Sequence, residues 1–244
     1  MSTAPALFAA LDAAIAGGTG DHSALDGAAF DALTQKEVRR FAKRYARLLN
    51  TPAERVPGVD NGRTPLHHLV LTLNGSDDLT PCVDAFLDAG ASATIGDAEG
   101  RTPLLMHTAE CVPSPALVQR LLGAHPAAAR RCDARGRGAL HLLAANQCAV
   151  PHGPDAGSQM TPDGITDEAA VERTARALVA AGAPGWDVPD AAGQTPRHAA
   201  ETNPNVLVRR AVLAAADAAS SRPSAPREDD ADAHETVDPR DDLL

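Results

Sequence analysis

Three histidines that share one position of a repeated block are the first candidates for chemistry in this sequence. His67 and His198 each stand three positions after a threonine, and His141 stands three positions after Gly138. An imidazole close to a hydroxyl group could bind a metal ion or transfer protons. Because the three histidines recur in one register, their role depends on what the block builds.

A second set of candidates pairs histidine with cysteine. His107 and Cys111 are four residues apart and would share one face of a helix, while Cys148 and His152 lie in a stretch rich in Pro and Gly. Two ligands make neither a closed zinc site nor a set of nucleophile, base and orienting group. The sequence also lacks a Gly-x-Ser-x-Gly elbow, a phosphate-binding glycine loop and a His-Glu-x-x-His motif. We therefore expect no catalytic residue, no metal and no cofactor.

The elements that position these residues follow from the repeated block, which reads Gly-Arg-Thr-Pro-Leu-His in its first copy. The block occurs at 62–67, 100–105, 136–141 and 193–198, so that its opening glycines are 38, 36 and 57 residues apart. A period of this length is typical of a repeat protein with one helix–turn–helix unit per repeat. The longest spacing indicates an insertion in the third repeat.

Each residue of the block has a mechanical explanation. Thr64 is suited to cap a helix, Pro65 fits the first helical position, and Gly62 permits a turn with positive φ before the helix. About 20 residues further on, the sequence predicts a second helix that ends near a glycine. These second helices end within segments 86–91, 121–126 and 178–183.

The pattern Asp-x-x-Gly-x-Thr-Pro-Leu-His, followed by Leu-Leu-x-x-Gly-Ala, closely resembles the ankyrin repeat. The opening aspartate of that family is matched by Asp97, Asp133 and Asp190. Departures from the pattern are Val59, Leu105, Gly138-Ala139 and Arg197. The resemblance implies a structural hydrogen-bonding role for the recurring histidines. The glycine in place of threonine should weaken one helix start, and Arg197 should face solvent in a degenerate last repeat.

The fold predicted from these patterns is an all-α, ankyrin-like helical solenoid with short hairpin tips and a helical N-terminal cap. The repeats span 58–216, and their boundaries are 58–95, 96–131, 132–188 and 189–216. The third repeat contains an insertion at 147–168, and a smaller one is expected at 74–78. Residues 217–244 are predicted to form a disordered tail, because they are acidic and almost devoid of apolar side chains.

The N-terminal region, 1–57, lacks the block and is predicted to cap the first repeat with helices over 4–16 and 27–49, the second broken near Thr34. Apolar residues of the first helix fall on one face. The second helix carries a basic cluster of Arg39, Arg40, Lys43, Arg44 and Arg47. This cluster fits a solvated face, but an acidic partner or the acidic tail could also use it.

The composition limits the class of protein. Apolar residues make up 44% of the chain but aromatic residues only 2%, which favours closely packed helices filled by Ala, Leu and Val. The net charge of −10 argues against general nucleic-acid binding. No apolar run is long enough for a membrane span, and no signal peptide opens the chain. Widely spaced cysteines favour reduced thiols in a cytosol.

Recognition of a protein partner is the function that remains. The resemblance implies binding through the hairpin tips and the exposed side of each first helix. These positions are Asp60, Asn61, Arg63, Leu71, Thr72, Glu99, Arg101, Glu110, Arg135, Arg137, Asn146, Gln194 and Asn203. Arg63, Arg101 and Arg137 share one register and would form a row that binds an acidic segment of a partner. Alternatively, the row pairs with neighbouring acids such as Asp97 and Glu99.

The sequence therefore predicts a non-catalytic module, monomeric by itself, that binds and occludes or tethers a protein partner. Only two lysines stand against 20 arginines, which favours a GC-rich, bacterial genome. Such a protein could be a cytoplasmic inhibitor, for example an immunity protein against a toxin. It could also be an effector delivered into a host cell, where few lysines would limit ubiquitination. Two further interpretations are a self-assembling structural scaffold and an enzyme with its site in the N-terminal helices or the insertion.

Overall fold

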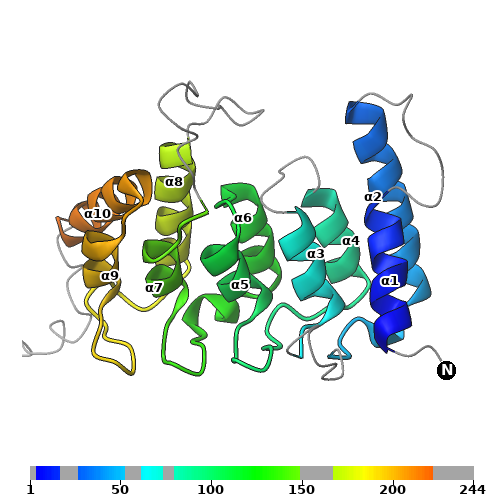
Figure 1. The fold of residues 1–244 in the computed structure, drawn as a ribbon, viewed down its shortest axis with the longest axis horizontal. Coiled ribbons are helices and arrows are strands. Elements are labelled where there is room, and N and C mark those ends of the chain that lie inside the picture. The colour runs from blue at the N-terminus through cyan, green and yellow to red at the C-terminus, as the bar shows by residue number, and fades with distance from the viewer. Residues whose placement is uncertain (1–3, 17–26, 53–61, 74–79, 149–166, 222–244) are drawn as a thin grey trace, which may run out of the picture.

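The chain folds as a row of paired helices (Figure 1). The computed structural model describes residues 4–16, 27–52, 62–73, 80–148 and 167–221. The α-helices in these ranges are α1 (Ala4–Ile15), α2 (Gly27–Arg44), α3 (Pro65–Leu73), α4 (Thr80–Asp88), α5 (Pro103–Glu110), α6 (Pro115–Ala124), α7 (Ala139–Ala144), α8 (Asp167–Ala180), α9 (Pro196–Thr202) and α10 (Val206–Ser220). Short 3₁₀ helices follow α2 and α6 as η1 (Ala46–Leu48) and η3 (Pro126–Arg130). These ranges contain no β-strand, which confirms the predicted all-α class.

The helices form two layers. In one layer α1, α3, α5, α7 and α9 pack against one another in chain order, and in the other α2, α4, α6, α8 and α10 do the same. Figure 1 shows α1 and α2 at one end of the row and α9 and α10 at the other. The turns that precede α5, α7 and α9 all project from the same side. Any residue that recurs in these turns is therefore placed in a line.

Aliphatic side chains fill the space between the layers. Leu66, Leu104 and Leu140 stand at the same position of the repeated block and are fully buried. Burial of such side chains removes apolar surface from water and supplies most of the favourable free energy of folding. In the last repeat Arg197 takes this position, is partly exposed, and forms an ion pair of 2.9 Å with Asp217.

The N-terminal helices pack against the helices of the first repeat. Helix α1 packs against α3, and α2 packs against α4. The predicted break near Thr34 is wrong, because α2 runs without interruption through this residue. The Thr34 side chain is buried and its hydroxyl donates a hydrogen bond of 3.1 Å to the carbonyl of Ile15. The hydroxyl group of Thr34 therefore finds its hydrogen-bond acceptor on the neighbouring helix, and α2 continues past this residue.

Threonine caps begin the helices as predicted. The hydroxyl oxygens of Thr102 and Thr195 accept hydrogen bonds from the amides of Leu105 and His198. Gly138 has no side chain to cap α7, and α7 is the shortest of the described α-helices. Helix α7 nevertheless begins at the same position of the block as α5 and α9, so the expected weakness of this helix start stays a prediction.

Several predicted segments lie outside the described residues or end at different places. Asp60, Asn61, the 74–78 insertion, residues 149–166 and everything beyond Ser221 are outside them. The last helix extends to Ser220, past the expected end of the repeats at 216. No helix in the described part of the chain is both long and apolar enough to cross a membrane.

Candidate functional site

The turns before α5, α7 and α9 are built by one aspartate each, and we call them the second (97–101), third (133–137) and fourth (190–194) hairpins. The Oδ1 atom of Asp97 accepts hydrogen bonds from the amides of both Glu99 and Arg101, at 3.0 and 2.9 Å. Asp133 and Asp190 accept the corresponding pairs of amides. The carboxylate therefore closes the turn from inside and holds its backbone in place.

Neighbouring hairpins are stacked in direct contact. The amide of Ala134 donates to the carbonyl of Glu99 at 2.8 Å, and the amide of Ala191 donates to that of Arg135 at 2.9 Å. Gly100 has a φ of 75°, and a Cβ at this residue would lie 3.2 Å from the amide nitrogen of Ala134. Glycine is thus required both for the turn and for the close approach of the next hairpin. The stacked hairpins form a rigid edge.

Arg101 of the second hairpin is surrounded by carboxylates. Its Nε atom donates to Oδ2 of Asp97 at 3.0 Å, and its Nη2 atom lies 2.5 Å from a carboxylate oxygen of Glu99. Its Nη1 atom pairs with Glu110 at the end of α5. Only 13% of the Arg101 side chain is exposed. The donors of this guanidinium group are therefore occupied within the protein.

Arg63 of the first repeat also lies close to the carboxylate of Glu110, which pairs with Arg101. The sequence has Val59 where the other repeats have an aspartate, so Arg63 lacks the acid that Arg101 and Arg137 pair with in their own turns. Its Nη2 atom lies 3.6 Å from the carboxylate of Glu110. Glu110 thus interacts with two arginines that stand in the same register, and this link was not expected from the sequence.

The arginines of the third hairpin are more exposed and, among the described residues, form fewer ion pairs than Arg101 of the second hairpin. Arg137 pairs with Asp133 through Nε at 2.8 Å and Nη2 at 2.7 Å, and 31% of its side chain is exposed. Arg135 is exposed, and its guanidinium group has no ion pair with any residue in the described ranges. The alternative interpretation of the row, that it pairs with neighbouring acids, therefore describes Arg101 and Arg137, which pair with the aspartates of their own hairpins. Arg135 has no ion pair among the described residues and stays a candidate contact position.

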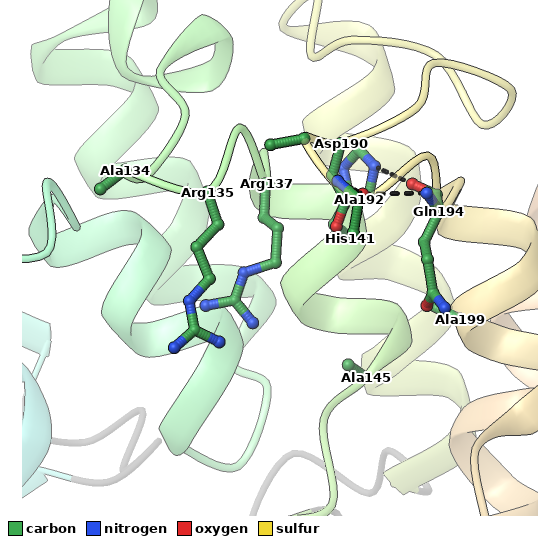
Figure 2. Close-up of a pocket in the computed structure, with 10 residues that line it drawn as sticks. Ala134, Arg135, Arg137, His141, Ala145, Asp190, Ala192, Gln194 and Ala199 are labelled. Atoms are coloured by element: carbon green, nitrogen blue, oxygen red, sulfur yellow. Dashed lines mark hydrogen bonds between the residues drawn. The ribbon is translucent and has the colours of Figure 1, made fainter.

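A pocket of about 470 Å³ lies beside Arg135, between the third and fourth hairpins. It is lined by Ala134, Arg135, Arg137, His141, Ala145, Asp190, Ala191, Ala192, Gln194 and Ala199. Figure 2 shows the guanidinium groups of Arg135 and Arg137 pointing in the same direction, with Gln194 and Ala199 across from them. A smaller pocket of about 260 Å³ adjoins the other side of the two arginines. Small side chains such as Ala145 and Ala199 create the hollow and gave no signal in the sequence.

Two of the recurring histidines hold the repeats together, which confirms the role that the resemblance implied. Nδ1 of His67 accepts a hydrogen bond from the amide of Thr64, so Nε2 donates to the carbonyl of Arg101 at 2.8 Å. His141 bonds the carbonyl of Gln194 in the same way at 3.1 Å. Burial lowers the pKa of His67, which keeps its ring neutral. His198 has no following repeat to bind and is exposed.

Asn146 and Asn203, both predicted to face a partner, are buried instead. The Nδ2 atom of Asn146 donates to the carbonyls of Thr108 and Cys111 at 2.8 and 3.0 Å. Asn203 donates to the carbonyls of Ala144 and Asn146, at 2.8 and 2.9 Å. Each asparagine thereby ties the end of one first helix to the end of the preceding one. Its recurrence five residues after the histidine position was the signal for this structural role.

The other predicted contact positions differ in exposure. Leu71 is half-buried, whereas Thr72 is exposed with its hydroxyl donating to the carbonyl of His68 at 2.9 Å. Gln194 is exposed and borders the pocket, and Glu99 is exposed beside Arg101. The structure therefore groups Arg135, Arg137 and Gln194 around one pocket and leaves Leu71 and Thr72 outside it.

His107 and Cys111 are packed within the protein. His107 is fully buried, and its Nε2 atom accepts a hydrogen bond of 3.0 Å from the amide of Ser114. Burial lowers the pKa of His107 to about 4 and raises the pKa of the Cys111 thiol to about 12. A neutral imidazole and a protonated thiol of this kind are poor reagents at neutral pH. Within the described ranges, no three His, Cys, Asp or Glu side chains are grouped so that they could hold a metal ion.

Two comparisons with known proteins found no relative of this chain. No protein-family model matches the sequence, and no curated protein shows a significant match to it. The function therefore rests on what the hairpins and the pocket can bind.

Proposed function

We propose that this protein is a non-catalytic, ankyrin-like binding module that recognises a protein partner through its hairpin edge. The observation that carries the proposal is the pocket between the third and fourth hairpins, bordered by Arg135, whose guanidinium group pairs with no acid among the described residues. An exposed cation beside a hollow on a rigid support is suited to receive a carboxylate of a partner. The proposed ligand is an aspartate, a glutamate or a C-terminal carboxylate in an extended segment.

The two hairpins that border the pocket are held in place by hydrogen bonds before any partner binds. Asp133 and Asp190 close the two hairpins, and the amide of Ala191 joins them. A surface that is ordered before binding loses little conformational entropy when the partner arrives. The module would therefore occlude or tether its partner without changing its own fold.

The charges along the edge restrict where an acidic segment can bind. Around the second hairpin, the carboxylates of Asp97, Glu99 and Glu110 neutralise Arg101 and repel further negative charge. Around the third hairpin, Arg137 forms an ion pair with Asp133 and also interacts with the carboxylate of Asp190, whereas Arg135 has no ion pair among the described residues. We therefore place the acidic residue of the partner near Arg135 and an uncharged or basic part of it near the second hairpin.

Site-specific crosslinking tests this proposal. A photoreactive amino acid replaces Ala192, which is exposed at the pocket, in the full-length chain within its native organism. A matched control carries the same amino acid in place of Arg173, which is exposed on α8 in the other layer. We expect one protein to be captured from position 192 and not from position 173, through a peptide that contains carboxylates. Equal capture from both positions, or a crosslinked peptide without acidic residues, would contradict the proposal.

The captured protein also decides between an inhibitor and an effector. A toxin made beside this chain would identify an inhibitor, which acts by covering a functional surface. A host protein would identify a delivered effector. Both outcomes use the same pocket, so the physical proposal does not depend on the choice.

A further inference from the structure

Helix α2 and the short η1 that follows it present a basic surface that the hairpin edge does not explain. Every exposed side chain between residues 36 and 47 is basic. We call this surface the α2 stripe, and its members are Lys36, Arg39, Arg40, Lys43, Arg44 and Arg47. The opposite face of the helix is apolar and packs against α1 and α4. The stripe therefore lies on the face of α2 that is turned away from its contacts with α1 and α4, and Figure 1 shows α2 at one end of the row.

Acidic side chains of the described residues neutralise little of the positive charge on the α2 stripe. Arg40 pairs with Glu37 at 2.5 Å, and no other ion pair joins the stripe to a residue in the described ranges. This differs from Arg101, which has three carboxylates around it. A shallow pocket of about 260 Å³ lies on the stripe, lined by Ala32, Gln35, Lys36, Arg39, Arg40 and Lys43. Like charges held this close together favour a polyanionic ligand.

The same chain contains a matching acidic segment. Residues 36–47 hold six basic side chains and one acidic side chain, whereas residues 228–242 hold eight acidic side chains and one basic side chain. The two segments have comparable length and opposite sign. In the repeats between them, acidic and basic residues are interspersed along the chain, so the repeats offer no comparable block of either sign.

We propose that the acidic segment 228–242 of one copy of this chain binds the α2 stripe of a second copy. The contact would consist of charge-assisted hydrogen bonds between carboxylates and the exposed basic side chains. Each chain offers one stripe near the start of its sequence and one acidic segment near the end. The association is therefore heterologous, and it yields a reciprocal dimer or larger assemblies as the concentration rises.

Geometry favours binding between copies over folding back within one copy. Helices α2 and α10 are four helix-pair spacings apart, or roughly 40 Å at the usual distance between packed helices. The centre of the acidic segment lies 14 residues beyond Ser221, and 14 residues span at most about 50 Å when fully extended. Reaching its own stripe would require an extended tail, whereas the stripe of another copy carries no such restriction.

Sedimentation velocity on the full-length chain tests the proposal over a range of concentrations, at about 50 mM and about 500 mM salt. At low salt we expect the average mass to rise with concentration to at least about twice that of the monomer, and at high salt to return to the monomer value. The double variant Arg39→Glu/Lys43→Glu should stay monomeric at low salt. The matched control Arg131→Glu/Arg173→Glu makes the same change in charge at exposed positions elsewhere and should associate as the natural chain does.

A mixing experiment separates pairing of these two segments from a general effect of charge. The variant Asp229→Lys/Asp230→Lys/Asp232→Lys should be monomeric by itself. When it is mixed with Arg39→Glu/Lys43→Glu, association should return, because the mixture contains one natural stripe and one natural acidic segment. Circular dichroism checks that each variant remains helical.

Three results would overturn the proposal. The first is a natural chain that is monomeric at every concentration at low salt, including the case in which its acidic segment binds its own stripe. The second is association that survives Arg39→Glu/Lys43→Glu. The third is binding of a single-stranded DNA oligonucleotide that depends on Arg39 and Lys43 while the chain alone stays monomeric, which would assign the stripe to nucleic acid.

Discussion

The second and third hairpins have the same backbone and nearly the same sequence motif, but they present different surfaces. In the second hairpin, Arg101 is held by carboxylates from its own turn and from the end of α5. In the third hairpin, Arg137 forms one ion pair among the described residues, and Arg135 stands where the second hairpin has the acidic Glu99. The second hairpin is thus neutralised by internal ion pairs, and the third keeps Arg135 without an ion pair among the described residues. A repeated motif determines the backbone position of a side chain, and the residues around that side chain determine whether its charge is already paired.

The largest expected effect comes from removing the aspartate of each hairpin. Asp97→Ala deletes two hydrogen bonds to backbone amides and the carboxylate that holds the nearly buried Arg101, so we expect a loss of about 3 kcal/mol in the free energy of unfolding. Asp133→Ala should cost about 2 kcal/mol, because the more exposed Arg137 can be solvated instead. Urea denaturation followed by circular dichroism measures both. Equal losses would show that the two hairpins do not differ as described, and Asp97→Asn, which keeps the acceptor oxygen, serves as the control.

A second effect concerns the helix beneath the second hairpin. Burial lowers the pKa of His107 to about 4, below the ordinary value of 6.5, so the unfolded chain takes up a proton in this range before the folded chain does. The stabilisation is present above about pH 6.5 and is lost as the pH falls from 6.5 towards 4. Between pH 7 and pH 5 this residue should account for a loss of about 2 kcal/mol.

The variant His107→Gln isolates that contribution, since its carbonyl oxygen can still accept the hydrogen bond from the amide of Ser114. Urea denaturation of both proteins at pH 7 and pH 5 gives four free energies of unfolding. We expect the natural chain to lose more stability than His107→Gln on acidification. Identical losses would mean that the imidazole is not buried in its neutral form.

The arginines themselves should differ by a smaller amount. Arg101→Gln removes three ion pairs from a side chain that is 13% exposed, and we expect a loss of about 1.5 kcal/mol in the free energy of unfolding. Arg135→Gln removes no ion pair within the described residues and should change stability by less than about 0.5 kcal/mol. Thermal unfolding of the two variants in parallel makes the comparison. A large loss for Arg135→Gln would reveal a structural role for that residue in the third hairpin.

Much of the fold could be predicted from the sequence, because the helix caps and the repeated positions of the block indicate the same helical elements. Thr102 and Thr195 predicted helix starts, and the recurring histidines predicted contacts between repeats. Thr34 misled because its intrinsic preference for ending a helix is outweighed by a hydrogen bond to Ile15 on the neighbouring helix. The tertiary contact decides in that case, and no local pattern records it.

The candidate site was harder to predict, because its properties come from residues far apart in the sequence. The register correctly placed Arg101 and Arg137 in one line, but it could not show that Asp97 and Asp133 also bind their side chains. Asn146 appeared at a position typical of a partner contact, and only the packing of neighbouring helices shows that it is buried. The pocket is equally non-local, since it is the space left between two hairpins.

The availability of Arg135 in the third hairpin is tested most directly by the affinity for the partner captured at position 192. Titration calorimetry compares the natural chain with Arg135→Gln and Arg101→Gln, all full length. We predict that Arg135→Gln weakens binding about tenfold, which corresponds to about 1.4 kcal/mol, and that Arg101→Gln weakens it less than about threefold. A partner that binds Arg135→Gln as tightly as the natural chain, or that depends on Arg101 to the same degree, would contradict the distinction between the two hairpins.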